Sequence, residues 1–269
     1  LLAKLVSQGG PKPAPQAVAD NVDKYFNPAW KTYGSVDGTF YGAPNSSNMK
    51  SFVWYSPKVF AEKGYTIPTT WDELTALSDQ MVKDGIKPWC GGIESGGATG
   101  WLATDWIEQL VLRQQGGEVY DKWVSHEITF QSPEIVKAMD TLAGWMKNPD
   151  YVNGGFGDVK TIATTAFQDA GGPILKGECA MLQQASFYAN FWENFQPGTT
   201  IAADGDVTAH LVLDRRTVGN AELGRRPELE QGAGVAPVGG FQIPGKGLAD
   251  IPVYTLPCGV FAGQNVLRS

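Results

Sequence analysis

The chain has 269 residues, and 21 lysines and arginines against 28 aspartates and glutamates give it a formal net charge of -7 at pH 7. Hydrophobic residues make up 42% of the chain and charged residues 18%, which is typical of a globular protein with one large domain or two smaller ones. The acidic balance and the lack of a basic cluster exclude a nucleic-acid footprint, and no apolar run reaches the roughly 18 residues of a membrane span.

The composition changes abruptly after residue 206. Residues 1–206 contain 27 of the 30 aromatic residues and all nine tryptophans, whereas residues 207–269 contain three aromatics. Lysine dominates among the basic residues of the first part and arginine among those of the second, which is also rich in Gly and Pro. Two interpretations stay open at this point: a loop-rich second region, or a tail that is not native coding sequence, such as the product of a reading-frame shift.

Hydrophobic periodicity and turn residues predict strands that alternate with helices. The predicted strands cover residues 39–43, 51–55, 87–93 and 177–183. The predicted helices cover residues 22–26, 57–62, 70–84, 103–115, 132–146 and 186–195. Such an alternation is typical of an α/β architecture with a largely parallel sheet. A polar crossing segment, residues 44–50, separates the first two strands.

Two of these helices carry clear local signals. Thr70 can cap the helix that follows it, and Glu73 can reach back as the second half of a capping box. The helix that begins near Ser132 is expected to turn one apolar side to the core. That side consists of Ile135, Val136, Met139, Leu142, Ala143 and Met146.

The carboxylates and histidines give weak signals for an enzyme. Asp105 and Glu108 lie three residues apart on one predicted helix, and Glu94 lies in the bend before it. A glycosidase needs two carboxylates that face each other across the scissile bond, which nothing in the sequence indicates, and a solvated helix face explains Asp105 and Glu108 better. His126 and His210 have no metal-ligand spacing, and the sequence contains no His-Glu-x-x-His, Gly-x-Ser-x-Gly or phosphate-binding Gly-rich motif. We therefore expect no metal, no cofactor and no catalytic residue.

The three cysteines, Cys90, Cys179 and Cys258, leave two possibilities open. Cys90 ends one predicted strand and Cys179 begins another, so adjacency in one sheet can bring them together. Spacing alone does not establish a disulfide, and three unpaired thiols are the alternative.

Aromatic residues gather just after two of the predicted strands. They are Trp101, Trp106, Phe187, Tyr188, Phe191 and Trp192. Ligands of open α/β sheets bind outside the carboxyl ends of the strands, where aromatic faces can stack on sugar rings and Glu94, Gln183 and Gln184 can bind hydroxyl groups. We interpret Trp106, Phe191 and Trp192 as core residues and place Trp101 and Phe187 at the rim.

Several sequence blocks resemble the extracellular solute-binding proteins of family 1, the carbohydrate receptors of ABC importers. They are residues 37–44 (Asp-Gly-Thr-Phe-Tyr-Gly-Ala-Pro), 50–56 (Lys-Ser-Phe-Val-Trp-Tyr-Ser), 68–74 (Pro-Thr-Thr-Trp-Asp-Glu-Leu), 88–96 (Pro-Trp-Cys-Gly-Gly-Ile-Glu-Ser-Gly), 177–181 (Gly-Glu-Cys-Ala-Met) and 184–187 (Gln-Ala-Ser-Phe). The blocks around residues 88–108 look like the α-glucoside-binding branch. The resemblance extends over residues 1–210 and fades where the composition changes.

The resemblance implies the type II periplasmic-binding-protein fold, an α/β fold with two hinged lobes that close on a sugar. It places a remnant of lobe one and the crossing segment in residues 1–55, and lobe two in residues 56–206. Residues 207–269 would then be an atypical tail rich in Gly, Pro and Arg, frame-shifted or disordered. The resemblance also implies that Cys90 and Cys179 lie on paired strands of an exported protein, so we expect a disulfide between them.

The implied function is binding of an α-glucoside or oligosaccharide between the lobes and its delivery to the membrane permease. The ligand-binding residues would be Glu94, Trp101, Gln184, Ser186 and Phe187 from lobe two, and Asn45, Asn48 and Lys50 from the crossing segment. The alternatives are a glycoside hydrolase that uses Glu94 and Asp105, and an inactive truncated fragment.

The resemblance further implies a monomeric receptor in the periplasm or at the cell surface, whose partners are a carbohydrate and the permease subunits of the importer. Residues 1–6 lack the charged, apolar and small-residue order of a signal peptide, and the chain has no initiating Met. We therefore expect the sequence to begin within a gene or after processing.

Overall fold

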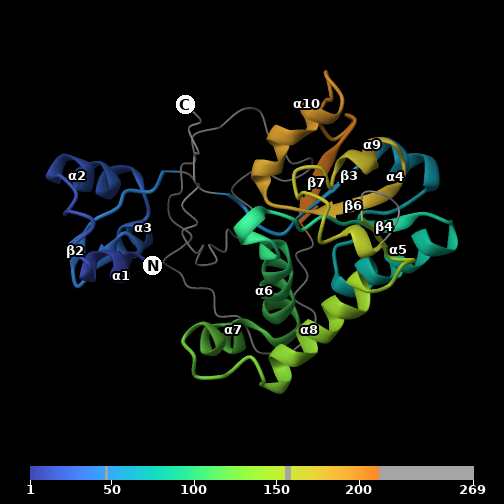
Figure 1. Cartoon of the computed structure of the whole chain (residues 1–269). Coiled ribbons are helices and arrows are strands. Elements are labelled where there is room, and N and C mark those ends of the chain that lie inside the picture. Colours follow the sequence, from blue (N-terminus) through green and yellow to red (C-terminus); the bar gives the residue numbers. More distant parts are fainter. Residues whose placement is uncertain (46–47, 155–158, 212–269) are drawn as a thin grey trace. The chain divides into compact units, whose positions relative to one another are not determined.

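The computed structural model describes residues 1–45, 48–154 and 159–211 of the chain (Figure 1). These residues fall into two compact units, the first formed by residues 1–45 and the second by the two later ranges. None of the described helices is long and apolar enough to cross a membrane.

The chain passes into the second unit between Ser47 and Asn48, whereas the sequence predicts a domain boundary after residue 55. The difference arises because Phe52–Tyr55 form strand β3 of the second unit's sheet. The predicted tail begins with Thr208–Leu211, which forms strand β7 of the same sheet, and the rest of that tail lies outside the described residues.

The first unit combines short helices with a hairpin. Its elements are α1 (Leu2–Ser7), α2 (Gln16–Tyr25), α3 (Pro28–Tyr33), β1 (Ser35–Val36) and β2 (Thr39–Phe40). The two strands pair across Asp37 and Gly38, which both adopt the positive φ that a two-residue hairpin turn favours. Helix α2 packs against Phe40. It begins earlier than the predicted helix at residues 22–26, and β2 is shorter than the predicted strand at residues 39–43.

The second unit is built on a five-stranded sheet with the strand order β5-β4-β6-β3-β7. Its remaining strands are β4 (Lys87–Cys90), β5 (Val152–Asn153) and β6 (Cys179–Gln183). Strand β4 runs parallel to β5 and β6, but β3 runs antiparallel to both β6 and β7. The reversal is confined to β3: β4, β5, β6 and β7 share one direction, so the expectation of a largely parallel sheet holds for four of the five strands. Because β3 runs antiparallel to β6 and β4 runs parallel to it, the amino end of β3 lies at the edge of the sheet where β4 and β6 end.

Helices surround this sheet (Figure 1). The α-helices are α4 (Pro57–Lys63), α5 (Trp71–Lys83), α6 (Trp101–Gln115), α7 (Gly117–Val124), α8 (Pro133–Met146), α9 (Gly172–Leu175) and α10 (Trp192–Phe195). The 3-10 helices are η1 (Gly96–Ala98), η2 (Val159–Thr161) and η3 (Ser186–Phe191). Helix α5 packs on β4, α9 packs on β6, and α6 packs against α7 and α8.

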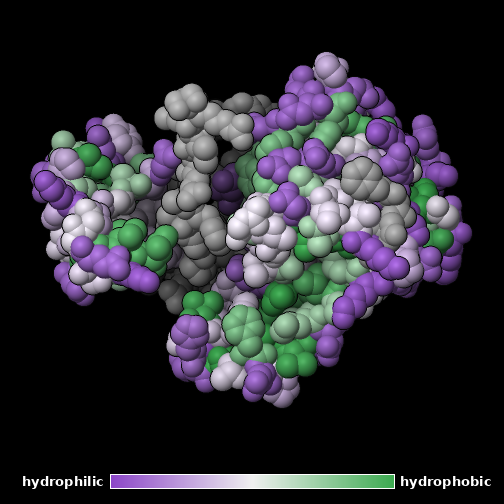
Figure 2. Space-filling model, in the orientation of Figure 1, coloured by the Kyte–Doolittle hydropathy of each residue, from purple (hydrophilic) through white to green (hydrophobic). Residues whose placement is uncertain are grey.

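Helix α8 corrects one sequence prediction. Its buried residues are Ile135, Ala138 and Leu142, which recur at helical spacing on one face. Val136 and Met139 were expected on that side but are 40% and 41% exposed, because they lie on the flank of the helix. Apolar side chains gather over the region of α7 and α8 at the bottom of Figure 2.

The main core of the second unit is aromatic. Trp54 of β3, Tyr188 of η3 and Trp192 of α10 are each fully buried, and the three rings contact one another. Phe191 packs against this cluster while half-buried. Trp106 is 4% exposed in a second aromatic group with neighbouring tryptophans of other elements. The interpretation of Trp106 and Trp192 as core residues is confirmed.

A capping box starts α5, as the sequence predicts. The Thr70 hydroxyl accepts the Glu73 backbone N–H at 3.0 Å, and the Glu73 carboxylate accepts the Thr70 backbone N–H at 3.2 Å. We expect Thr70→Ala to lower the free energy of unfolding by about 1 kcal/mol, because the Glu73 backbone N–H in the first turn of α5 loses its acceptor and the capping box is broken. Urea denaturation followed by circular dichroism measures the change. Thr75→Ala within the same helix is the control, and equal losses in both variants would contradict a capping role.

A disulfide joins Cys90 at the end of β4 to Cys179 at the start of β6, the pair that the family resemblance implied. Their Cα atoms are 5.4 Å apart, and both residues are buried in the main core. The bond closes a loop with a sequence separation of 89 residues. Cys258 lies outside the described residues.

Candidate functional site

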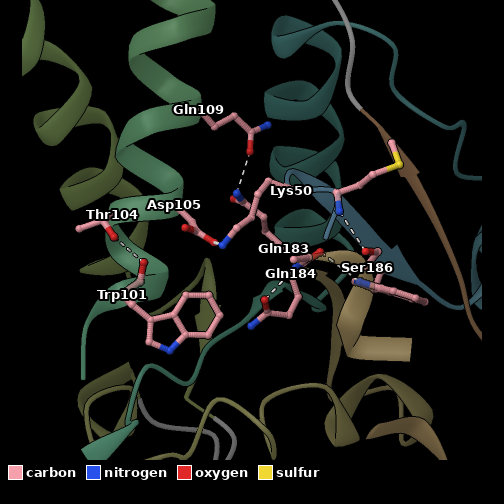
Figure 3. Close-up of polar contacts among 11 residues, drawn as sticks. Lys50, Trp101, Thr104, Asp105, Gln109, Gln183, Gln184 and Ser186 are labelled. Carbon is pink, nitrogen blue, oxygen red and sulfur yellow. Dashed lines mark hydrogen bonds and ion pairs between the residues drawn. The ribbon is translucent and has the colours of Figure 1, made fainter. Parts of the chain in front are cut away.

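Because β3 runs antiparallel to β6, residues before β3 meet residues after β4 and β6 at one edge of the sheet. Met49 and Lys50 come directly before β3, while Trp101 starts α6 after β4, and Gln184 and Ser186 follow β6. Since the amino end of β3 and the carboxyl ends of β4 and β6 share this edge, segments far apart in the sequence come together there (Figure 3).

The chain before β3 is fixed to the loop after β6 by two hydrogen bonds. The Met49 backbone N–H donates to the Ser186 Oγ at 3.0 Å, and the Ser186 backbone N–H donates to the Met49 carbonyl at 2.9 Å. The predicted ligand residue Asn48 is half-buried beside this connection. Asn45, also predicted, is an exposed residue of the first unit.

Lys50 makes an ion pair with Asp105 of α6, at 2.6 Å between Nζ and Oδ2 (Figure 3). The two side chains are 29% and 19% exposed, so the pair is partly shielded from water. Burial raises the pKa of Asp105, and the nearby Lys50 ammonium opposes that rise. The pKa of Glu108 is raised as well, by burial and then by the negative charge of Asp105.

Three half-buried rings pack together at this edge. Trp101 lies 5.2 Å from Phe167 and 6.1 Å from Phe187 between ring centroids, and Phe167 lies 6.2 Å from Phe187. The Lys50 Nζ lies 5.1 Å from the centroid of Trp101, within the range of a cation–π interaction. The aromatic edge, as we call it, consists of Lys50, Trp101, Phe167, Gln184 and Phe187.

Phe167 is not among the site residues predicted from the sequence. This residue follows no strand of its own, and a single parallel bridge between Glu94 and Ala166 brings it to the edge. The Phe167 backbone N–H donates to the Glu94 carbonyl at 3.0 Å. No periodic pattern in the sequence around Phe167 indicates this bridge.

Two neighbouring glutamines at the end of β6 point in different directions. The Gln183 amide nitrogen donates to Gln109 of α6 at 2.7 Å. The Gln184 Oε1 accepts the Ala185 backbone N–H at 2.9 Å, and in Figure 3 the amide group lies toward Trp101. Gln184 is 2% exposed, and among the described residues its buried Nε2 has no hydrogen-bond partner. A buried amide N–H without a partner is costly, which marks Gln184 as a candidate donor for a ligand.

Glu94 is half-buried in the bend after β4. Its Oε1 accepts the Gly96 backbone N–H at 2.6 Å, so one carboxylate oxygen already has a partner within the loop. The described residues contain no group of three or more His, Cys, Asp or Glu side chains placed to bind a metal ion. Half-buried rings beside amide and carboxylate groups suit a ligand that has both apolar faces and hydroxyl groups.

Comparison with known proteins places the chain in a family. A model of the bacterial extracellular solute-binding proteins matches residues 1–210. The alpha-glucosides-binding periplasmic protein AglE of Rhizobium meliloti is 41% identical over 198 residues, which cover 72% of this chain and 42% of AglE. The osmoprotective compounds-binding protein GgtB of Synechocystis is 40% identical over 136 residues, 51% of this chain and 32% of GgtB. The chain thus spans less than half the length of either relative.

Solved structures share the fold. The bacterial solute receptor AcbH, described as having an exclusive preference for β-D-galactopyranose, matches with a TM-score of 0.57 and 25% identity, over 78% of this chain and 49% of AcbH. A chitin oligosaccharide binding protein matches with a TM-score of 0.62 and 19% identity, over 79% of this chain and 50% of that one. The predicted α/β fold of type II periplasmic binding proteins is confirmed. The chain belongs to the family of bacterial extracellular solute-binding proteins.

Proposed function

We propose that the protein is the substrate-binding receptor of a carbohydrate ABC importer and that it binds an α-glucoside or an oligosaccharide at the aromatic edge. One structural observation carries the proposal: the buried Nε2 of Gln184, which has no hydrogen-bond partner among the described residues, lies toward Trp101, and the Trp101 ring packs against Phe187. The relative AglE, which is 41% identical over 198 residues, is named as a binding protein for α-glucosides, and this supports the choice of sugar.

The physical chemistry of sugar binding fits this arrangement. A pyranose ring offers C–H groups on its faces and hydroxyl groups around its rim, so it binds where aromatic faces and polar groups alternate. The Gln184 Nε2 would gain an acceptor from a sugar hydroxyl, which removes the cost of an unpaired buried donor. Trp101 and Phe187 would supply the stacking faces.

Other predicted residues would complete the set of polar contacts. Glu94 has a second carboxylate oxygen that can accept sugar hydroxyls, and the Ser186 hydroxyl can donate while its oxygen accepts the Met49 N–H. Asn45 and Asn48 stay predictions of the sequence.

The proposed receptor works by binding, without a chemical step. A sugar shifts the receptor toward a closed state by its differential contacts, and that state delivers it to the permease subunits of the importer. This role places the protein in the periplasm or at the cell surface, as a monomer.

Calorimetric titration with maltose, trehalose and sucrose tests the proposal, with sorbitol as a polyol without a ring. We expect saturable binding of at least one of the three sugars and none of sorbitol. Glu94→Ala should weaken that binding more than about twofold, a loss of roughly 0.4 kcal/mol, because an acceptor for sugar hydroxyls is lost. Glu62→Ala, which removes an exposed carboxylate from α4, is the control. Absence of saturable binding by all three sugars would contradict the proposal.

The alternative function, glycoside hydrolysis by Glu94 and Asp105, is tested by incubating the protein with maltose or trehalose and measuring glucose release. We expect no release, because the Asp105 carboxylate pairs with Lys50 at 2.6 Å and one Glu94 oxygen is bonded to the Gly96 N–H. Glucose release that Glu94→Ala abolishes would favour the hydrolase instead.

A further inference from the structure

The segment that leads into β3 is attached to the rest of its unit at two successive residues. Met49 makes its two hydrogen bonds with Ser186, and Lys50 makes its ion pair with Asp105. The next residue, Ser51, has a φ of 67°, in the left-handed region that residues other than glycine rarely adopt. Such a conformation is unfavourable by itself and persists where its surroundings fix it. The attachments at Met49 and Lys50, together with the pairing of β3 after Ser51, therefore fix the position of the Lys50 backbone.

Lys50 contacts two residues on one face of α6. Trp101 and Asp105 are four residues apart in the helix, and this spacing places their side chains on the same face. The Lys50 ammonium lies 2.6 Å from the Asp105 carboxylate and 5.1 Å from the Trp101 ring centroid. One cation thus links the segment before β3 to the first turns of α6 (Figure 3).

The local charges require that cation. Asp105 and Glu108 lie on the same helix, where partial burial raises the pKa of both carboxyl groups and the negative charge of Asp105 raises the pKa of Glu108 further. The two carboxylates have different partners. The Tyr120 hydroxyl of α7 donates to Glu108, and the Lys50 ammonium donates to Asp105. A lysine that already pairs with a carboxylate and lies against an indole has less capacity to bind sugar hydroxyls itself.

We propose that Lys50 is a positioning residue for sugar binding, which fixes the indole of Trp101 through its contacts with that ring and with Asp105. The inference rests on the proposed function and changes the role of Lys50 within it: the lysine acts on the sugar through Trp101. Neutralising either member of the ion pair should then have the same effect, because removing the Lys50 ammonium or releasing it from Asp105 takes the cation away from the Trp101 ring.

A double-mutant cycle in calorimetric titration with the preferred sugar tests this role. We expect Lys50→Met and Asp105→Asn each to weaken binding about fivefold, which corresponds to roughly 1 kcal/mol. The double variant should be no weaker than Lys50→Met alone, since both changes remove one interaction. Lys50→Arg, which keeps the cation, should bind within about twofold of the unchanged protein. Lys58→Met, which breaks the ion pair of Lys58 with Asp206, is the control and should leave affinity unchanged.

The cycle shows whether Lys50 and Asp105 act on sugar binding through one interaction. If they act independently, the losses in the double variant multiply, and that result would overturn the inference. Unchanged affinity in Lys50→Met would overturn it as well.

A second readout needs no sugar and therefore stands apart from the proposed function. In protein labelled with 5-fluorotryptophan, the fluorine resonance of Trp101 is assigned by its loss in Trp101→Phe. Lys50→Met and Asp105→Asn should both shift this resonance, and Lys58→Met should not. A Trp101 resonance that stays in place in both variants refutes the positioning role, whereas a shift without any sugar binding refutes the proposed function and leaves the contact with Trp101 standing.

Discussion

Replacing both Cys90 and Cys179 by alanine is expected to lower the free energy of unfolding by about 4–5 kcal/mol. The disulfide closes a loop with a sequence separation of 89 residues, and a loop of that length removes much conformational entropy from the unfolded chain. Alanine leaves a small void at two buried positions without burying a polar group, so the lost cross-link dominates. Urea denaturation in the absence of reductant measures the change.

The control for this prediction is Cys258→Ala, which should leave the denaturation midpoint unchanged. Thiol titration of denatured, unreduced protein should find one reactive group among the three cysteines of the sequence. Three reactive groups, or a double variant as stable as the unchanged protein, would contradict the disulfide.

Trp101→Ala should have the largest effect on ligand binding. The indole is half-buried, contacts Phe167 and Phe187, and is the ring beside which the Lys50 ammonium lies. Removing it takes away the proposed stacking face, and we expect the affinity for the preferred sugar to fall at least tenfold, a loss of about 1.4 kcal/mol or more.

Calorimetric titration measures the affinity, and a conservative variant and a control variant are measured beside Trp101→Ala. Trp101→Phe keeps an aromatic face and should lose less affinity than Trp101→Ala. Phe130→Ala, which removes an aromatic ring that is 59% exposed between α7 and α8, should bind like the unchanged protein. Affinity within twofold in Trp101→Ala would show that the site is placed wrongly.

Local signals in the sequence predicted much of the fold. The capping box of Thr70 and Glu73 started α5 at the predicted residue, and Gly64 ended α4 in a left-handed conformation. These signals act between residues a few positions apart, so the sequence displays them directly. The direction of β3, in contrast, is not determined by residues close to it in the sequence. It depends on pairing with β6 and β7, more than a hundred residues away, and alternation of strands and helices suggested the wrong direction.

The residues of the candidate site also differ in whether local sequence signals predict their positions. Trp101 and Phe187 could be placed at the rim because each follows a predicted strand closely. Phe167 could not, because a single backbone bridge with Glu94 brings it there. The pairing of Lys50 with Asp105 joins residues 55 positions apart through side chains alone, and no local pattern predicts such a contact.

The central claim is that a sugar binds against Trp101. In protein labelled with 5-fluorotryptophan, titration with maltose, trehalose or sucrose should shift the Trp101 resonance saturably. The resonance of Trp71, which packs with Trp106 and Trp145 in the separate aromatic group, should stay in place. A Trp101 resonance that remains unmoved up to about 50 mM of all three sugars, a concentration that would reveal millimolar affinity, would contradict the account.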